Sequence, residues 1–84
     1  MRDHRRIDEI LDLIKEIWMR DPDVRFNQLL YVLQSSYSKQ HAGLGRVEEK
    51  DTYGTTRLGF DFFNLEDSLF LKHLHKVANE KKKS

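Results

Sequence analysis

The fold is decided by the stretch Ile7-Asp8-Glu9-Ile10-Leu11-Asp12-Leu13-Ile14-Lys15-Glu16-Ile17-Trp18. Its apolar side chains recur at intervals of three and four, as on one stripe of a helix. That stripe comprises Ile7, Ile10, Leu11, Ile14, Ile17 and Trp18. Asp3 is the predicted N-cap, and Pro22 forces an end before Asp21. The pattern predicts a helix over about residues 4–20.

Two further helices are predicted downstream. The second follows the turn signal Asp21-Pro22-Asp23, and Gly43 offers its stop. Because the link is short, helices one and two should form an antiparallel hairpin. The third should begin after the N-cap Asn64, with Asp67 bonding back to it. Their apolar stripes are Phe26, Leu29, Leu30, Leu33 and Tyr37, and then Leu65, Leu69, Phe70, Leu74 and Val77.

Residues 41–59 separate the second helix from the third and hold all four glycines of the chain. Apolar side chains are scarce there, although Val47 and Leu58 flank a turn-forming segment. We therefore expect either a mobile Gly/Thr-rich loop or a short β-hairpin. The fold class is mainly α: a helical hairpin plus a third helix.

The whole chain, residues 1–84, should form a single small helical domain, because a chain this short has interior for only one core. It contains no cysteine, so disulfides and thiolate metal sites are excluded. Residues 79–84 are expected to form a basic tail.

Part of the pattern resembles the YihD-like small bacterial proteins. The likeness lies in residues 7–14, Trp18, Asp21-Pro22-Asp23 and the following Phe26-Asn27-Gln28-Leu29-Leu30. A later Asn64-Leu65-Glu66-Asp67, with Leu69 and Leu74, continues it. The resemblance implies a compact helical fold and carries no site residue, because that family has no established activity.

Charge and hydropathy limit the classes of partner. The 15 basic side chains are balanced by 14 acidic ones, so no global field drives nucleic-acid binding. The longest purely apolar run, Leu29 to Leu33, is far shorter than the roughly 18 residues that a membrane-spanning helix needs. We therefore expect a cytoplasmic protein that binds no membrane.

Neither metal nor catalytic chemistry is predicted. His73 and His75 are two residues apart and would diverge on a helix, so we interpret them as exposed residues and not as ligands. Ser35, Ser36 and Ser38 with His41 are the only local nucleophile and base candidates, and they sit where turn-forming residues end a helix. We expect no enzyme activity and no cofactor.

The aromatic group after the loop is the candidate binding site. Phe60, Phe62, Phe63 and Phe70 supply more apolar surface than one helix face needs. They either close the core or contact another protein. We expect a noncatalytic protein-binding module, such as a small regulator or inhibitor, and a homodimer whose interface includes Phe62, Phe63 and Phe70.

DNA binding is the alternative function. Basic side chains gather at both chain ends and could contact phosphates together. They are Arg2, Arg5, Arg6, Lys81, Lys82 and Lys83. A winged-helix arrangement, with residues 47–58 as the wing, would strengthen this hypothesis.

Overall fold

The computed structural model describes residues 2–80, and their contacts fall into two compact units within the predicted single domain. The first, which we call the two-helix unit, comprises Met1–Arg25 and Leu65–Ser84. The second, the helix–hairpin unit, comprises Phe26–Asn64. Three helices and one two-stranded antiparallel sheet make up the described chain.

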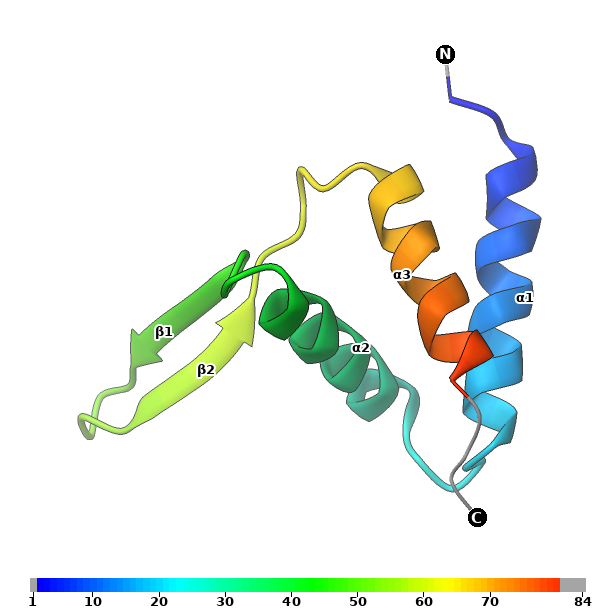
Figure 1. Cartoon of the computed structure of the whole chain (residues 1–84). Coiled ribbons are helices and arrows are strands. Elements are labelled where there is room, and N and C mark those ends of the chain that lie inside the picture. Colours follow the sequence, from blue (N-terminus) through cyan, green and yellow to red (C-terminus); the bar gives the residue numbers. More distant parts are fainter. Residues whose placement is uncertain (1, 81–84) are drawn as a thin grey trace. The chain divides into compact units, whose positions relative to one another are not determined.

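In the two-helix unit, α1 (Arg5–Met19) lies along α3 (Asp67–Asn79), and both helices run in the same direction (Figure 1). At their first turns, Arg6 Nε donates to Asp67 Oδ2 at 2.7 Å. At their last turns, Arg20 Nη1 donates to the carbonyl oxygen of Val77 at 3.1 Å. Side-chain contacts therefore join the two helices at both ends.

The predicted helix over residues 4–20 is confirmed as α1, but its stripe is shifted. The half-buried apolar side chains are Ile10, Leu13, Ile14, Ile17 and Trp18. Ile7 and Leu11, predicted to belong to the stripe, are 51% and 58% exposed. The half-buried arc is centred between Ile10 and Ile17, so Leu11 falls outside it, whereas Ile7 is exposed in the first turn of the helix. No side chain of α1 is fully buried.

The two predicted N-caps had different outcomes. His4 occupies the N-cap position of α1, yet Asp3 does satisfy a free amide there, because its Oδ1 accepts the backbone N–H of Arg5 at 2.9 Å. Asn64 as the cap of α3 is wrong. Glu66 takes that position with an extended backbone, and its carbonyl accepts the N–H of Leu69 at 3.0 Å. Helix α3 therefore begins at Asp67, two residues later than an Asn64 cap requires.

In the helix–hairpin unit, α2 (Phe26–Gln40) packs against the second strand of a β-hairpin. Leu29, Leu33 and Tyr37 of α2 are buried and lie four residues apart, on one face. The strands β1 (Arg46–Lys50) and β2 (Thr56–Phe60) pair antiparallel, with Arg46 opposite Phe60 and Lys50 opposite Thr56. Of the two expectations for residues 41–59, the short β-hairpin is confirmed.

Two glycines shape this hairpin. Gly54 has a φ of +79° and closes the turn, where its N–H donates to the carbonyl of Asp51 at 3.0 Å. Gly45 has a φ of +81° at the start of β1, and a Cβ there would overlap the ring of Phe62. Both positions therefore favour glycine, and Gly45 does so for two independent reasons.

The predicted antiparallel hairpin of α1 with α2 stays a prediction, because these helices belong to different units. What the structure does establish is the pairing of α1 with α3, two segments far apart in the sequence.

Candidate protein-binding surface

Phe60 and Phe62 belong to an aromatic cluster of the helix–hairpin unit. Phe60 meets Tyr31 of α2 edge-on, with ring centroids 5.4 Å apart. Phe62 meets Tyr37 in the same way, also at 5.4 Å, and the Phe60 and Phe62 rings lie parallel at 6.1 Å. Each of these phenylalanines is half-buried. Most of their apolar surface therefore serves to join β2 and the following residues to α2.

The cluster forms because the hairpin returns the chain to the end of α2. The N–H of Asp61 donates to the carbonyl of Gly45 at 2.8 Å, which extends the ladder one pair beyond the strands. This bond brings Phe62 over Gly45, where the missing side chain leaves room for the ring. The glycine and the aromatic ring thus depend on each other.

Phe63 differs from its neighbours, because its side chain is 91% exposed. Its backbone is nevertheless held in place: the N–H of Phe63 donates to Asp61 Oδ1 at 3.1 Å. An aspartate that accepts the amide two residues later forms a local turn that fixes the backbone. Phe63 is therefore a large apolar side chain presented to solvent from an ordered turn.

Tyr53, which the sequence reasoning missed, lies in a matching turn at the hairpin tip. Its side chain is 92% exposed, and Asp51 Oδ1 accepts the N–H groups of Tyr53 and Thr55, each at 2.9 Å. The shared signal is an aspartate two residues before an aromatic, in Asp51-Thr52-Tyr53 and Asp61-Phe62-Phe63. That repeat could have identified both positions from the sequence.

Phe70 belongs to the two-helix unit, whereas the other three predicted residues belong to the helix–hairpin unit. It is half-buried on α3, with its ring 5.9 Å from the ring of His73. The four predicted partner-binding residues are therefore of three kinds. Phe60 and Phe62 pack in the aromatic cluster, Phe63 is exposed, and Phe70 belongs to another unit.

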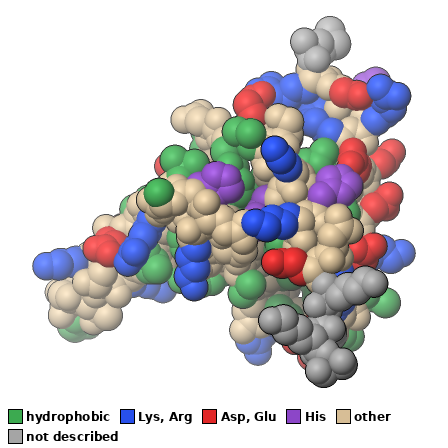
Figure 2. Space-filling view, viewed as in Figure 1, with side chains coloured by type: hydrophobic (Ala, Val, Ile, Leu, Met, Phe, Trp, Pro, Cys, Tyr) green, Lys and Arg blue, Asp and Glu red, His purple; other side chains and the backbone are tan. Residues whose placement is uncertain are grey.

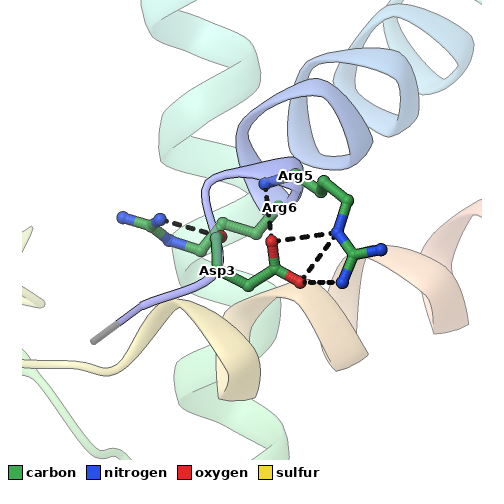
Figure 3. A network of polar contacts seen from close by, with 3 residues as sticks. All are labelled: Asp3, Arg5 and Arg6. Carbon is green, nitrogen blue, oxygen red and sulfur yellow. Dashed lines mark hydrogen bonds and ion pairs between the residues drawn. The ribbon is translucent and has the colours of Figure 1, made fainter.

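The arginines near the N-terminus are each paired with a carboxylate. Arg5 Nη2 lies 2.8 Å from Asp3 Oδ2, and Arg6 Nη1 donates to the carbonyl of Asp3 at 3.0 Å (Figure 3). Arg2 Nη2 lies 2.6 Å from Glu66 Oε2. The hydrogen bond to Arg5 lowers the pKa of Asp3, and the bond to Glu66 raises the pKa of Arg2. The predicted lysines 81–83 lie outside the described residues.

A shallow hollow of about 520 Å³ lies at this end of the two-helix unit. It is lined by these three arginines and by four acids, Asp3, Glu9, Glu66 and Asp67. Figure 2 shows acidic and basic side chains interspersed around the N-terminal end. Phosphate binding would have to displace carboxylates from the arginines, so this end is a poor site for nucleic acid.

Three of the four histidines occupy three different environments. His75 Nε2 lies 2.5 Å from Glu9 Oε2 on the surface of the two-helix unit. His73, predicted to be exposed, is buried with 4% exposure, because it lies on the same face of α3 as Val77 and the half-buried Phe70. His41 stacks on Tyr37 at 4.0 Å, and its Nδ1 donates to the carbonyl of Tyr37 at 2.9 Å. Among residues 2–80, no three acidic or histidine side chains converge as metal ligands.

The end of α2 is closed by backbone hydrogen bonds to Ser38. Ser38 is buried, and its carbonyl accepts the N–H of His41 at 3.1 Å and that of Gly43 at 2.8 Å. These bonds satisfy carbonyls at the helix end. Because His41 Nδ1 bonds a carbonyl of α2, that nitrogen cannot act as a base toward Ser38.

Comparison with known proteins gives no relative: no family model, no curated protein and no solved structure matches the chain. The resemblance to YihD-like proteins stays an expectation from the sequence. Among residues 2–80, no helix is long and apolar enough to cross a membrane.

Proposed function

We propose that this chain is a noncatalytic protein-binding module, and that Phe63 is the anchor of its binding surface. The observation that carries the proposal is the 91% exposure of Phe63 on a backbone fixed by Asp61. A buried phenylalanine side chain is worth about 1.5 to 3 kcal/mol relative to an exposed one. A partner with an apolar pocket for this ring would recover that free energy.

The turn also reduces the entropic cost of binding. A side chain presented from an ordered backbone loses less conformational freedom on association than one from a mobile loop. Large aromatic residues that enter a pocket are typical binding hot spots. Phe63 meets both conditions, whereas Phe60 and Phe62 already contact tyrosines of α2.

The test is an affinity purification with matched variants. Wild type, Phe63→Ser and Tyr53→Ser are immobilised at equal density, and proteins retained from a lysate of the native host are quantified by mass spectrometry. Both replaced side chains are more than nine-tenths exposed, so neither substitution should lower the thermal midpoint measurably.

A partner should be retained by wild type and by Tyr53→Ser. The amount retained by Phe63→Ser should be at least about tenfold lower, as expected for a hot-spot residue. Reconstitution with the purified partner then confirms direct binding. Equal retention by all three proteins would contradict the role of Phe63.

DNA binding remains the second candidate, for a reason other than the chain ends. Helix α2 carries no acidic side chain and a single lysine, Lys39, and the hairpin follows it directly. A helix followed by a hairpin wing is the arrangement that the winged-helix hypothesis requires. If DNA is the ligand, retention should fall steeply with salt and should be weakened by Lys39→Glu.

A further inference from the structure

The outer edge of β1 has backbone groups that no strand within residues 2–80 pairs. The bonds from Asp61 N–H to the Gly45 carbonyl and from Asp51 N–H to the Thr55 carbonyl fix the alternation of the ladder. Odd-numbered residues of β1 therefore bond to β2. The N–H and C=O groups of Glu48 and Lys50 and the C=O group of Arg46 point away from it, whereas the Arg46 N–H donates to the carbonyl of Gly43 at 3.1 Å.

This edge is accessible within the helix–hairpin unit. All five residues of β1 are exposed, and α2 packs against β2. A two-stranded sheet by itself is only marginally stable, and an unpaired edge is a template for a further strand. Charged side chains usually protect such an edge, so the charge pattern decides which strand can pair with it.

The pattern Arg46-Val47-Glu48-Glu49-Lys50 restricts antiparallel pairing with a second copy of β1. For two antiparallel copies of β1 to form hydrogen bonds, the outward-pointing backbone groups of one copy must face those of the other. A pairing in which three or more strand residues of each copy overlap then requires a two-fold axis at Val47, Glu48 or Glu49. An axis at Glu48 places Glu48 against its copy and Arg46 against Lys50. An axis at Glu49 places Glu49 against its copy. Like charges directly opposite each other destabilise both registers.

An axis at Val47 removes every like-charge pair. Arg46 of each copy then lies opposite Glu48 of the other, and Val47 lies opposite Val47. In a single chain, Arg46 and Glu48 already form an exposed ion pair at 3.2 Å, so their side chains share one face of the strand. In the paired register, four alternating charges meet on that face.

Val47 gives a second, independent reason for this register. Its cross-strand neighbour in β2 is Gly59, and the space above Gly59 is open. Val47 is consequently 37% exposed and has no side chain opposite it on β2. A Val47 from a second copy, in a closely spaced pair, would supply the missing apolar neighbour.

We propose that β1 pairs antiparallel with β1 of a second copy of this chain about a two-fold axis at Val47, joining the two hairpins into one sheet. This surface goes beyond the proposed function, because it is separate from Phe63 and does not depend on it. Edge pairing buries little area, so the dimer is weak, with a Kd of about 10 to 100 μM.

The test is charge reversal, read by sedimentation velocity of the full chain at concentrations from about 5 to 500 μM. Arg46→Glu and Glu48→Arg, each alone, place like charges opposite each other twice and should weaken dimerisation at least about tenfold. An equimolar mixture of the two variants restores opposite charges at both positions and should dimerise like wild type. The double variant, with both reversals in one chain, should dimerise as well.

Two controls make the outcome specific. Lys72→Glu reverses an exposed charge on α3 and should leave the dimer intact, and so should Phe63→Ser. A wild type that stays monomeric up to about 500 μM overturns the proposal. So does a mixture of the two single variants that fails to associate, or single variants that dimerise as wild type does. Loss of a host partner with Phe63→Ser tests the proposed function alone.

Discussion

The two-helix unit and the helix–hairpin unit are held together by different kinds of contact. In the former, exposed or half-exposed ion pairs between α1 and α3, Arg6 with Asp67 and His75 with Glu9, accompany the fully buried Leu74 of α3. In the latter, Leu29, Leu33 and Tyr37 are buried, and aromatic rings join α2 to the chain after β2. Apolar burial stabilises more than exposed ion pairs do. Substitutions in the buried aromatic part of the helix–hairpin unit should therefore cost more stability than substitutions of the ion pairs of the two-helix unit.

Arg20 is the main polar link of the two-helix unit. Its guanidinium donates to the carbonyls of Val77, Ala78 and Glu80 at the end of α3, and it lies 3.7 Å from Glu16. The last carbonyls of a helix lack partners within the helix, so a cation placed there satisfies them and interacts favourably with the helix dipole. One side chain of α1 thus completes the end of α3.

The largest effect is expected for Tyr37→Ala. Tyr37 is 2% exposed and contacts Phe62 and His41. Removing a buried aromatic ring should lower the free energy of unfolding by about 3 to 5 kcal/mol, measured by urea denaturation. Tyr31→Ala is the matched control, because Tyr31 is 45% exposed and should cost clearly less. Equal losses would show that the burial of Tyr37 adds nothing to the stability of this unit.

Periodicity in the sequence was enough to predict the helices and too little to predict their partners. The spacing of Ile10, Ile14 and Ile17 locates α1, yet it does not say which helix α1 meets. The pairing with α3 joins segments far apart in the chain, and Arg20 reaches backbone carbonyls, which leave no pattern in the sequence.

The candidate site was predicted in part for a similar reason. Composition marked the phenylalanines near residue 60 as surplus apolar surface, but it could not separate Phe63 from Phe60 and Phe62. That separation depends on the hairpin, which brings Phe62 over Gly45 and against Tyr37 and leaves Phe63 outside. A local turn can be recognised from sequence. The side on which a neighbouring ring packs can be determined only from the three-dimensional fold.

Gly45→Ala should have the next largest effect. A residue with a side chain is strained at a φ of +81°, and the new Cβ would overlap Phe62. The two terms together should cost about 2 to 4 kcal/mol in urea denaturation. Gly43→Ala isolates the backbone term, because its φ is +84° but no atom lies within 4 Å of the added Cβ. If both variants lose the same free energy, the Phe62 overlap contributes nothing.

Arg20→Ala should cost less, about 1 to 2 kcal/mol, because the carbonyls at the end of α3 can partly bond water instead. Glu16→Ala provides the comparison, since it removes only an exposed partner of Arg20 and should change the free energy of unfolding by less than about 0.5 kcal/mol. Hydrogen exchange would also localise the effect, with faster exchange in the last turn of α3 for Arg20→Ala alone. Faster exchange spread over α1 and α3 alike would argue against a cap at one helix end.

The smallest effect is expected for Asp3→Asn, and it should depend on pH. Asparagine can still accept the Arg5 N–H, so the substitution removes the charge facing the Arg5 guanidinium and keeps the amide acceptor. The pKa of Asp3 is lowered from its ordinary value of 3.8 by the hydrogen bond to Arg5. A carboxyl with a lowered folded pKa contributes stability that is complete above the ordinary pKa and is lost as pH falls through the lowered one. Wild type should therefore melt at a slightly higher temperature than Asp3→Asn at about pH 6, and the two melting temperatures should converge below about pH 3.

Because the pair of Asp3 and Arg5 is exposed, raising the salt concentration should shrink the difference in melting temperature as well. A melting difference that is the same at both pH values would mean that the Arg5 charge does not act on Asp3, and titration of the Asp3 carboxyl carbon by NMR would check this directly.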